Sequence, residues 1–339
     1  MQRTRFEDIT RRFAGKRIVV CGDFFLDRYL WVDPARAEIS IETGHTAHQV
    51  THHTFAPGAA GTVAANLAAL GAEVVCVGVI GDDGDGMLLR QGLHRINVND
   101  SLLVVTPDRV TSTYTKPSIR YADGSVHELE RLDIRNRSPL DATVGIQIAA
   151  SLITLADECD AMVFADQMPE TGCGVIGTAV HEAIQTIAHT RPHLPMFADS
   201  RQRIADFRGV IIKPNLHEAT QASQLDEAIT SAHDAAMLLS RHTKRPVVMT
   251  LGATGALVYA DGASSTIDAI PVDAPIDVVG AGDSVMAALA LSSASGASLV
   301  EAAQIAMLVA AVTVRKIGTT GTASIPELVD IATRFARFS

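Results

Sequence analysis

The segment DVVGAGDSVMAALAL, residues 277–291, places two glycines and two carboxylates directly before a run of small apolar residues. The run predicts a helix, and Gly280 and Gly282 allow a ligand to approach the backbone amides at its start. A helix start attracts anions, because its first amides lack partners and the helix dipole is positive there. Asp283 then has two candidate roles: it caps the helix, or it is the base for a hydroxyl that attacks a bound phosphoryl group.

Two further segments carry residues suited to a nucleotide and its metal ion. In KPNLHE, Asn215 follows a predicted strand, and Glu218 either faces a hydrated Mg²⁺ or improves the start of a helix. In TLGATG, Gly252 and Gly255 form a turn that admits a nucleotide or is an ordinary hairpin turn. The sequence contains neither GxxxxGK[ST] nor a GxGxxG after a strand, so a kinase of this sequence is neither a P-loop nor a protein-kinase type.

Short apolar strands must position these residues, and helical segments separate most of them. The strand patterns are KRIVVCGD, AEVVCVGVIGDD, ECDAMVFADQ, HLPMFADS, GVIIKPN and RPVVMTLG. This alternation predicts a parallel sheet with helices on both faces, and ligands of such sheets bind outside the carboxyl ends of the strands. The polar and glycine residues that follow the strands are therefore expected along one edge: Asp23, Asp27, Asp82, Asp166, Asp199, Asn215, Glu218 and Gly252.

Two segments, about 28–56 and 108–133, interrupt this alternation. They carry alternating Thr, Tyr, His and charged residues, which favours solvated antiparallel strands. We interpret them as a small β lid inserted into a single domain that spans residues 1–339. The first segment holds four histidines, and a polar lid surface or hydrogen bonding to a sugar is favoured over a metal site, because no cysteine or carboxylate completes a ligand set. These residues are His45, His48, His52 and His53.

The composition excludes several classes of partner. The chain has 339 residues, 47% of them hydrophobic, and a net charge of −10, which disfavours nucleic acid and anionic membranes. Its apolar stretches are shorter than the roughly 20 residues of a membrane span. The charged N-terminus lacks the apolar core of a secretory signal, so a cytoplasmic protein is expected, with its four separated cysteines reduced.

Taken together, these motifs resemble those of the ribokinase-like (PfkB) carbohydrate kinases over nearly the whole chain. The resemblance rests on the motifs GDFFLDRY, PGAAGTVAANLAALGA, VGVIGDDGDG, ISIE, YTK, ERLD, KPNLHE, TLGATG and DVVGAGDSV, which occur in the family order. It implies a three-layer αβα sandwich with a mainly parallel sheet and an inserted β lid. Within the family the sequence is most similar to the heptose 7-phosphate kinases of ADP-heptose synthesis.

The resemblance also implies roles for individual residues on the donor side. Asp283 would be the general base, with Gly280 and the amides of Ala281, Gly282 and Asp283 forming an anion hole. ATP and Mg²⁺ would be the cofactors, with Glu218 holding Mg²⁺ through water. The ATP site would include Asn215, Glu218, Thr250, Gly252 and Gly255. Asp277 would help to bind a monovalent cation such as K⁺ or would cap a turn.

On the acceptor side, the resemblance implies contacts from five residues to a sugar or sugar phosphate. These are Asp27, Gly58, Thr62, Lys116 and Arg131. A lid that closes over the sugar would exclude water and prevent wasteful hydrolysis of ATP. Because lids of this family pair between subunits, a homodimer is implied.

Several positions depart from the heptose kinase pattern. Ala59 and Thr62 replace a glycine and an asparagine, Glu38 stands where an arginine is expected, and DSRQ replaces DPKG while retaining Arg201. A carboxylate facing the site would disfavour a phosphorylated sugar, so Glu38, if it faces the site, argues against heptose 7-phosphate. The alternative acceptors are an unphosphorylated hexose, pentose or nucleoside, and the alternative of another class is a non-catalytic sugar or nucleotide sensor.

Overall fold

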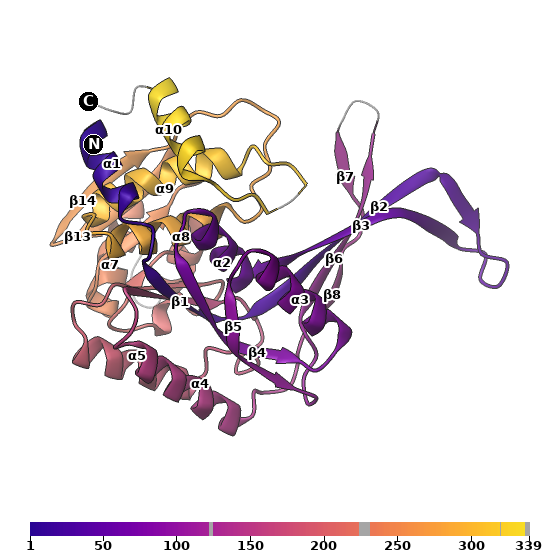
Figure 1. Ribbon diagram of the computed structural model, residues 1–339, viewed down its shortest axis with the longest axis horizontal. Coiled ribbons are helices and arrows are strands. Elements are labelled where there is room, and N and C mark those ends of the chain that lie inside the picture. The colour runs from indigo at the N-terminus through magenta and orange to yellow at the C-terminus, as the bar shows by residue number, and fades with distance from the viewer. Residues whose placement is uncertain (122–124, 224–230, 319, 336–339) are drawn as a thin grey trace.

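A mainly parallel sheet forms the centre of the molecule (Figure 1). The computed structural model describes residues 1–121, 125–223, 231–318 and 320–335, and in these residues the sheet has nine strands in the order β14-β13-β12-β11-β10-β9-β1-β4-β5. Its neighbouring strands pair in parallel except at β12–β13 and β13–β14, because β13 runs against the others. The strands are β1 (Arg17–Gly22), β4 (Glu73–Gly81), β5 (Asn99–Thr106), β9 (Ala161–Asp166), β10 (Met196–Ser200), β11 (Ile211–Ile212), β12 (Val247–Thr250), β13 (Gly255–Ala260) and β14 (Ala263–Asp268).

Helices cover both faces of this sheet, because its central strands are apolar on both faces. In β1, Ile18 and Val20 face one core cluster while Val19 and Cys21 face the other. The first cluster is covered by α1 (Arg3–Arg11), α2 (Ala60–Ala69), α3 (Gly84–Arg95), α8 (Ala281–Ala294), α9 (Leu299–Thr313) and α10 (Ile325–Arg334). The second is covered by α4 (Ala142–Leu155), α5 (Thr178–Thr190), α6 (Leu216–Ser223) and α7 (Ala232–Thr243). This three-layer arrangement confirms the predicted fold class.

A second, five-stranded sheet is built from the two segments that interrupt the alternation of strands and helices. Its strands are β2 (Phe24–Ile39), β3 (Thr46–Ala59), β6 (Thr113–Arg120), β7 (Val126–Glu128) and β8 (Leu132–Ile134). Residues 122–124 of the second segment lie outside the described residues. The expectation of purely antiparallel strands is wrong at one place, because β2 pairs with β6 in parallel. That pairing places the start of both strands beside the central sheet.

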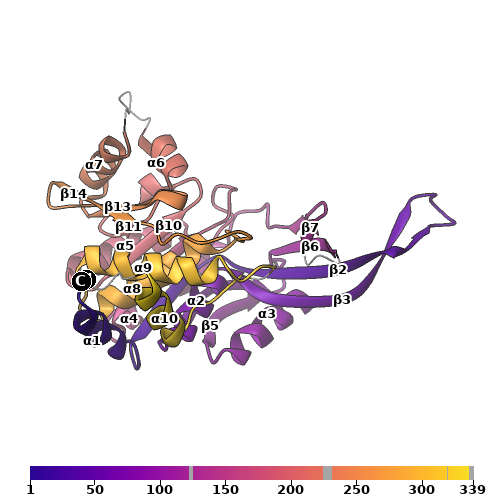
Figure 2. The same cartoon turned by 90° about the horizontal axis from the view of Figure 1, so that it is seen from above.

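The β2–β3 hairpin projects far from the body of the molecule (Figures 1 and 2). His45, His48, His52 and His53 are all exposed on this hairpin, as a polar lid surface requires. Within the described ranges no three His, Cys, Asp or Glu side chains gather in a way that could hold a metal ion. None of the helices in the described part of the chain is both long enough and apolar enough to span a bilayer.

Candidate active site

A cavity of about 610 Å³ lies at the carboxyl ends of the parallel strands, between β12, α8 and α9. Ala281 and Gly282 line it. So do all five residues predicted for the ATP site, which are Asn215, Glu218, Thr250, Gly252 and Gly255. Its apolar wall comes from Ala269, Ile270, Pro271, Val272, Ile276, Val278, Met307, Ala310, Ala311 and Val314. A pocket with one polar end and one apolar wall suits a flat base that carries phosphates.

The start of α8 forms the polar end of this cavity. Gly280 precedes the helix with a φ of 77°, and a Cβ added there would lie 3.2 Å from the methyl carbon of Thr62. The amide of Ala281 already donates to Val278 O at 3.1 Å, so it is committed to a turn rather than free for an anion as predicted. The amides of Gly282 and Asp283 belong to the first turn, which has no acceptors within the helix. These two amides remain as donors for a ligand.

Asp283 lies on this first turn, partly open to the site. Burial of its carboxyl and the negative charge of Asp199 raise its pKa to about 7, although Lys213 and Arg201 oppose the shift. A carboxyl group with this pKa can accept a proton near neutral pH and release it again.

Asn215 and Glu218 bind each other across the first turn of α6. Glu218 N donates to Asn215 Oδ1 and Asn215 N donates to Glu218 Oε2, both at 2.8 Å, which is a reciprocal capping arrangement. The helix-start role considered for Glu218 is therefore present. The same carboxylate also lines the cavity, and burial with the charge of Asp199 raises its pKa.

Gly252 and Gly255 belong to the hairpin between β12 and β13, as the alternative interpretation predicted. Gly252 opens a short 3-10 helix, η2 (Gly252–Thr254), and lines the cavity as well. Gly255 has a φ of 113°, and an added Cβ would lie 2.0 Å from Ile267 O. Only glycine fits there, and the tight hairpin that it allows lines the cavity.

The predicted acceptor residues gather where the second sheet meets the first. Asp27 on β2 and Lys116 on β6 form a buried ion pair, with Lys116 Nζ 3.3 Å from Asp27 Oδ2. Lys116 Nζ also lies 3.4 Å from Tyr29 Oη and over the ring of Tyr29. A Cβ on Gly58 would lie 2.9 Å from the carboxyl carbon of Asp27, so glycine permits this close approach. Burial raises the pKa of Asp27, whereas Lys116, Arg131 and Arg201 lower it.

Arg131 and Thr62 occupy the edges of this acceptor region. Arg131 Nε lies 2.7 Å from Asp133 Oδ1, and its guanidinium lies 4.2 Å from the centre of the Tyr114 ring. Thr62 is buried at the start of α2, where its hydroxyl donates weakly to Pro57 O at 3.4 Å. Its methyl carbon lies against Gly280, so Thr62 connects the acceptor region to the start of α8.

Asp277 braces the turn that precedes α8. Its Oδ1 accepts from Val279 N at 3.0 Å, and its Oδ2 accepts from Gly318 N at 3.1 Å. The turn-capping role considered for Asp277 is therefore present, and the contact to Gly318 also fixes the segment that follows α9.

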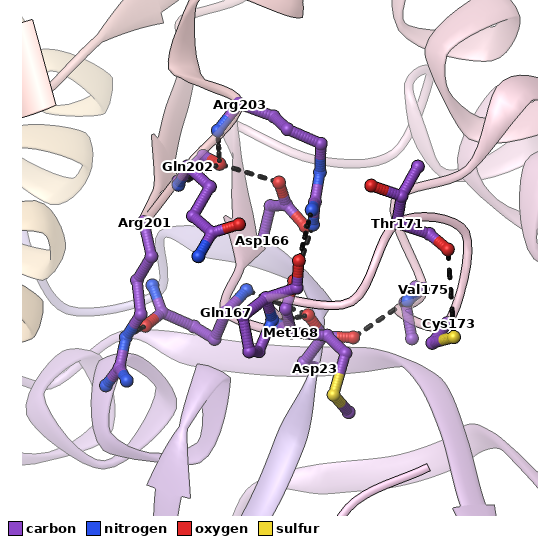
Figure 3. A network of polar contacts seen from close by, with 12 residues as sticks. Asp23, Asp166, Gln167, Met168, Thr171, Cys173, Val175, Arg201, Gln202 and Arg203 are labelled. Carbon is purple, nitrogen blue, oxygen red and sulfur yellow. Dashed lines mark hydrogen bonds and ion pairs between the residues drawn. The ribbon is translucent and has the colours of Figure 1, made fainter. Parts of the chain in front are cut away.

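Asp23 and Asp166, both expected along the ligand-binding edge of the sheet, bind groups of the protein itself. The Asp23 carboxylate accepts three backbone amides, from Gln167, Met168 and Val175, at 2.7–2.9 Å (Figure 3). Asp166 is buried and binds Arg203 at 2.6 Å. Burial and the charge of Asp166 raise the pKa of Asp23 to about 6, against the effect of the amides. These groups hold the segment 167–175 in place beside the acceptor region.

Sequence reasoning missed two basic residues of the site. Lys213 is buried at the end of β11, with its Nζ 3.1 Å from Asp199 Oδ2, and a Cβ on Gly282 would lie 3.6 Å from that Nζ. Burial alone would lower the pKa of Lys213, but Asp199, Glu218 and Asp283 raise it. A lysine between Ile212 and Pro214 in an apolar strand was the signal. Arg201 follows β10 and was noted only as a departure.

The expectation that Glu38 opposes a phosphorylated sugar finds no support in this chain. Glu38 is exposed on the outer part of β2, opposite Ala47, and it lines none of the described cavities. Ala59, by contrast, occupies a position suited to the glycine of the heptose kinase pattern, because its φ is 54° and its ψ is −119°.

Sequence comparison identifies the family and related proteins. Residues 17–326 match the family model "pfkB family carbohydrate kinase". Two curated relatives, both named bifunctional protein HldE, come from Caulobacter vibrioides (35% identical, 92% of this chain) and Paramagnetospirillum magneticum (33% identical, 91% of this chain). The matched regions span 62% of the length of each relative.

Solved structures establish the fold independently. Arabidopsis thaliana ribokinase complexed with ribose and ATP superimposes with a TM-score of 0.69 at 16% identity, covering 94% of this chain and 98% of that chain. Phosphofructokinase-2 from Escherichia coli in complex with fructose-6-phosphate superimposes with a TM-score of 0.71 at 19% identity, covering 96% of this chain and 100% of that chain.

Proposed function

This chain belongs to the pfkB family of carbohydrate kinases and is a phosphotransferase with an alcohol group as acceptor; we propose that it transfers the γ-phosphoryl group of ATP to a hydroxyl of a sugar or sugar phosphate, with Asp283 as general base. The observation that carries this proposal is the position of Asp283. Its carboxyl stands on the first turn of α8, at the polar end of the cavity, and its pKa is raised to about 7.

The proposed chemistry follows from the groups around this carboxyl. Asp283 takes the proton of the acceptor hydroxyl as the oxygen attacks the γ-phosphorus, and the bond from phosphorus to the β,γ-bridging oxygen breaks to release ADP. The amides of Gly282 and Asp283 and the ammonium of Lys213 supply positive charge at the place where negative charge develops.

The donor set fits a hydrated Mg²⁺ rather than a metal held only by protein. Mg²⁺ keeps several waters and commonly binds through one or two carboxylates plus substrate phosphates, where it neutralises phosphate charge. We propose Glu218 as the carboxylate that meets this hydrated ion, since one of its oxygens is used for capping and the group lines the cavity. Asn215 beside it would orient the phosphates.

The turn at Asp277 is proposed chiefly as a brace. Both carboxylate oxygens of Asp277 accept backbone amides. A monovalent cation bound at this turn is the second candidate role. Replacing K⁺ by a bulky organic cation in the assay tests it, because a working cation site would make turnover depend on K⁺.

For the acceptor, we propose heptose 7-phosphate as the first candidate. Support comes from the motifs shared with heptose kinases and from the position of Glu38 outside the described cavities. A neutral hexose, pentose or nucleoside is the alternative acceptor. It is kept because Thr62 stands where the heptose kinases have an asparagine, so a short hydroxyl replaces a longer amide beside the acceptor. A sensor without catalysis is less well supported, because the proposed base retains its raised pKa.

We further propose that the described fold acts as one kinase domain and that its lid pairs with the lid of a second copy, in the cytoplasm where ATP is supplied. Five apolar side chains are exposed on the strands and hairpin of the second sheet, as an interface requires: Ile39, Ile41, Val50, Leu132 and Ile134. Light scattering of the wild type and of an Ile39→Glu variant tests the dimer.

The function itself is tested by ADP release with ATP and Mg²⁺ across free sugars, sugar phosphates including heptose 7-phosphate, and nucleosides. Asp283→Asn should lower kcat by about a thousandfold, because general-base catalysis contributes roughly 10²–10⁴-fold, while ADP affinity stays unchanged. Asp330→Asn, at an exposed carboxylate on α10, is the matched control. Retention of most activity by Asp283→Asn would exclude Asp283 as the base, and ATP binding without turnover of any acceptor would favour the sensor.

A further inference from the structure

Four basic side chains surround the proposed reaction centre, and they differ in whether a carboxylate of the protein forms an ion pair with them. Three of them are paired with carboxylates: Lys213 with Asp199 at 3.1 Å, Lys116 with Asp27 at 3.3 Å, and Arg131 with Asp133 at 2.7 Å. Arg201 differs, because its Nε donates to the neutral amide oxygen of Gln167 at 2.8 Å. Among the residues that the structure describes, no carboxylate lies within ion-pair distance of Arg201. Its charge is thus available to a ligand.

Arg201 is held at its base by a buried polar network (Figure 3). Its backbone amide donates to Asp166 O at 3.3 Å, next to the buried pair of Asp166 and Arg203. Gln167, which receives the Arg201 side chain, is itself buried, and its amide donates to Asp23 at 2.8 Å. Figure 3 shows the Arg201 side chain running alongside Gln167, with the end of the guanidinium extending beyond it.

The location of Arg201 relates it to both substrates at once. Arg201 directly follows β10, two residues after Asp199, which lines the nucleotide cavity. Its side chain donates to Gln167, which begins the segment 167–175 beside the acceptor region. In keeping with this location, its positive charge lowers the pKa of Asp27, Glu218 and Asp283. Lys213 acts on Glu218 and Asp283, but it is buried and committed to Asp199. Arg201 is exposed. It therefore stands between donor and acceptor with a free face.

We infer that Arg201 binds the phosphoryl group during its transfer between ATP and the acceptor, and that Gln167 is the positioning residue that orients it. This inference rests on the proposed function. A guanidinium presents a planar fork of donors that matches two phosphoryl oxygens, and it keeps its proton throughout. The acceptor proton goes to Asp283, the new oxygen–phosphorus bond forms, and ADP leaves with the electron pair. Arg201 stabilises the charge on the equatorial oxygens, which is the largest task in phosphoryl transfer.

Steady-state kinetics of Arg201→Gln and Arg201→Lys test the inference. Arg201→Gln should lower kcat by about 10²–10³-fold with every acceptor, while KM for ATP and for the acceptor changes less than about threefold, because cations of this kind act mainly in the transition state. Arg201→Lys should recover part of the loss, since it restores the charge without the fork. The acid limb of the pH–rate profile should move to higher pH in Arg201→Gln, because the cation that lowers the pKa of Asp283 is gone.

Gln167→Leu tests the positioning role. It should lower kcat by about tenfold with unchanged KM, and the double variant with Arg201→Gln should be no slower than Arg201→Gln alone. Arg241→Gln, which removes one exposed positive charge on α7, is the matched control and should behave as the wild type. Independent effects of the two changes would overturn the role of Gln167.

Binding of ADP with aluminium fluoride keeps the test independent of acceptor turnover. This probe imitates the phosphoryl group in transit, so Arg201→Gln should weaken binding of ADP with aluminium fluoride about a hundredfold relative to ADP alone. Equal weakening of both, or none, would overturn the inference. A loss confined to KM for phosphorylated acceptors would assign Arg201 to the acceptor's own phosphate and would equally overturn it. Failure of the wild type to release ADP with any acceptor would instead reject the proposed function.

Discussion

The nucleotide cavity and the acceptor region are built in different ways, although they share one reaction centre. The cavity is walled by buried helices and a tight hairpin of the main sheet, and its polar end combines backbone amides of α8 with side chains that follow the strands of the main sheet. The acceptor region is formed by side chains from β2, β3 and β6, which belong to a second sheet with an exposed outer half. The nucleotide cavity is thus built on the main sheet and the helices that cover it, whereas the acceptor region depends on how the second sheet meets the first.

Each region contains one buried ion pair, and the effects of breaking the two pairs on folding and on ligand binding can be compared. In the nucleotide cavity, the side chains of Lys213 and Asp199 are 3% and 13% exposed. In the acceptor region, those of Lys116 and Asp27 are 7% and 6% exposed. The first pair sits at the end of the central strands β10 and β11, so it serves stability as well as binding. The second joins two lid strands, so its loss should affect acceptor binding more than folding.

The largest effect is expected from Lys213→Met. Removing one partner of a buried pair leaves an uncompensated carboxylate, so the free energy of unfolding should fall by about 3–5 kcal/mol. ADP binding should weaken strongly too, because three carboxylates near the phosphates lose their cation. Urea unfolding and calorimetric titration with ADP measure the two effects. Adding Asp199→Asn should recover much of the stability, and no recovery would contradict this account of the pair.

The second prediction concerns pH. Because the pKa of Asp283 in the free protein is raised to about 7 and the proposed base must be ionised, kcat/KM should fall about tenfold per unit as the pH drops below 7 and level off above it. The residual rate of Asp283→Asn should show no such limb. An acid limb near pH 4 in the wild type would mean that the carboxyl is not perturbed or is not the base.

Asp283 also makes stability depend on pH. Its folded-state pKa is raised, so its effect on stability has the opposite sign to that of a carboxylate whose pKa is lowered by folding. The folded state holds the Asp283 proton more tightly than the unfolded chain, so this group's contribution to stability is present below pH 4 and is lost as the pH rises through 7. Asp283→Asn should therefore melt at a higher temperature than the wild type at pH 8. This difference should disappear near pH 4.

Short motifs made the donor side predictable from the sequence. Asn215, Glu218, Gly252, Gly255 and the start of α8 each belong to a short local motif, and all of them line one cavity. The three-layer fold was predictable for the same reason, since apolar strands and helices alternate along the chain.

The acceptor side could not be derived in the same way. The contact of Lys116 with Asp27 joins residues 89 positions apart through a parallel strand pair that the alternating pattern does not reveal. Arg201 and Gln167 meet across 34 positions. Sequence motifs name such residues but do not say which of them share a partner, so the acceptor itself remained open.

The fourth prediction separates the two regions directly. Lys116→Met should raise KM for the acceptor about tenfold and leave KM for ATP unchanged, because Asp27 loses the cation that lowers its pKa and binds sugar hydroxyls less well as a neutral acid. Lys16→Met, which breaks the surface pair with Asp160, is the control. A matching rise in KM for ATP would show that the lid pair also shapes the nucleotide cavity.

The smallest effect is expected at Ala59, where the two sheets meet. Its φ of 54° with a ψ of −119° is a conformation that glycine adopts freely and alanine does not. Ala59→Gly relieves this strain but gives the unfolded chain more freedom, so the net gain in unfolding free energy should be at most about 1 kcal/mol. Urea unfolding measures it, with Ala68→Gly in the regular helix α2 as the control that should destabilise by a similar amount. A loss of stability in Ala59→Gly would show that packing of the Ala59 methyl group outweighs the strain.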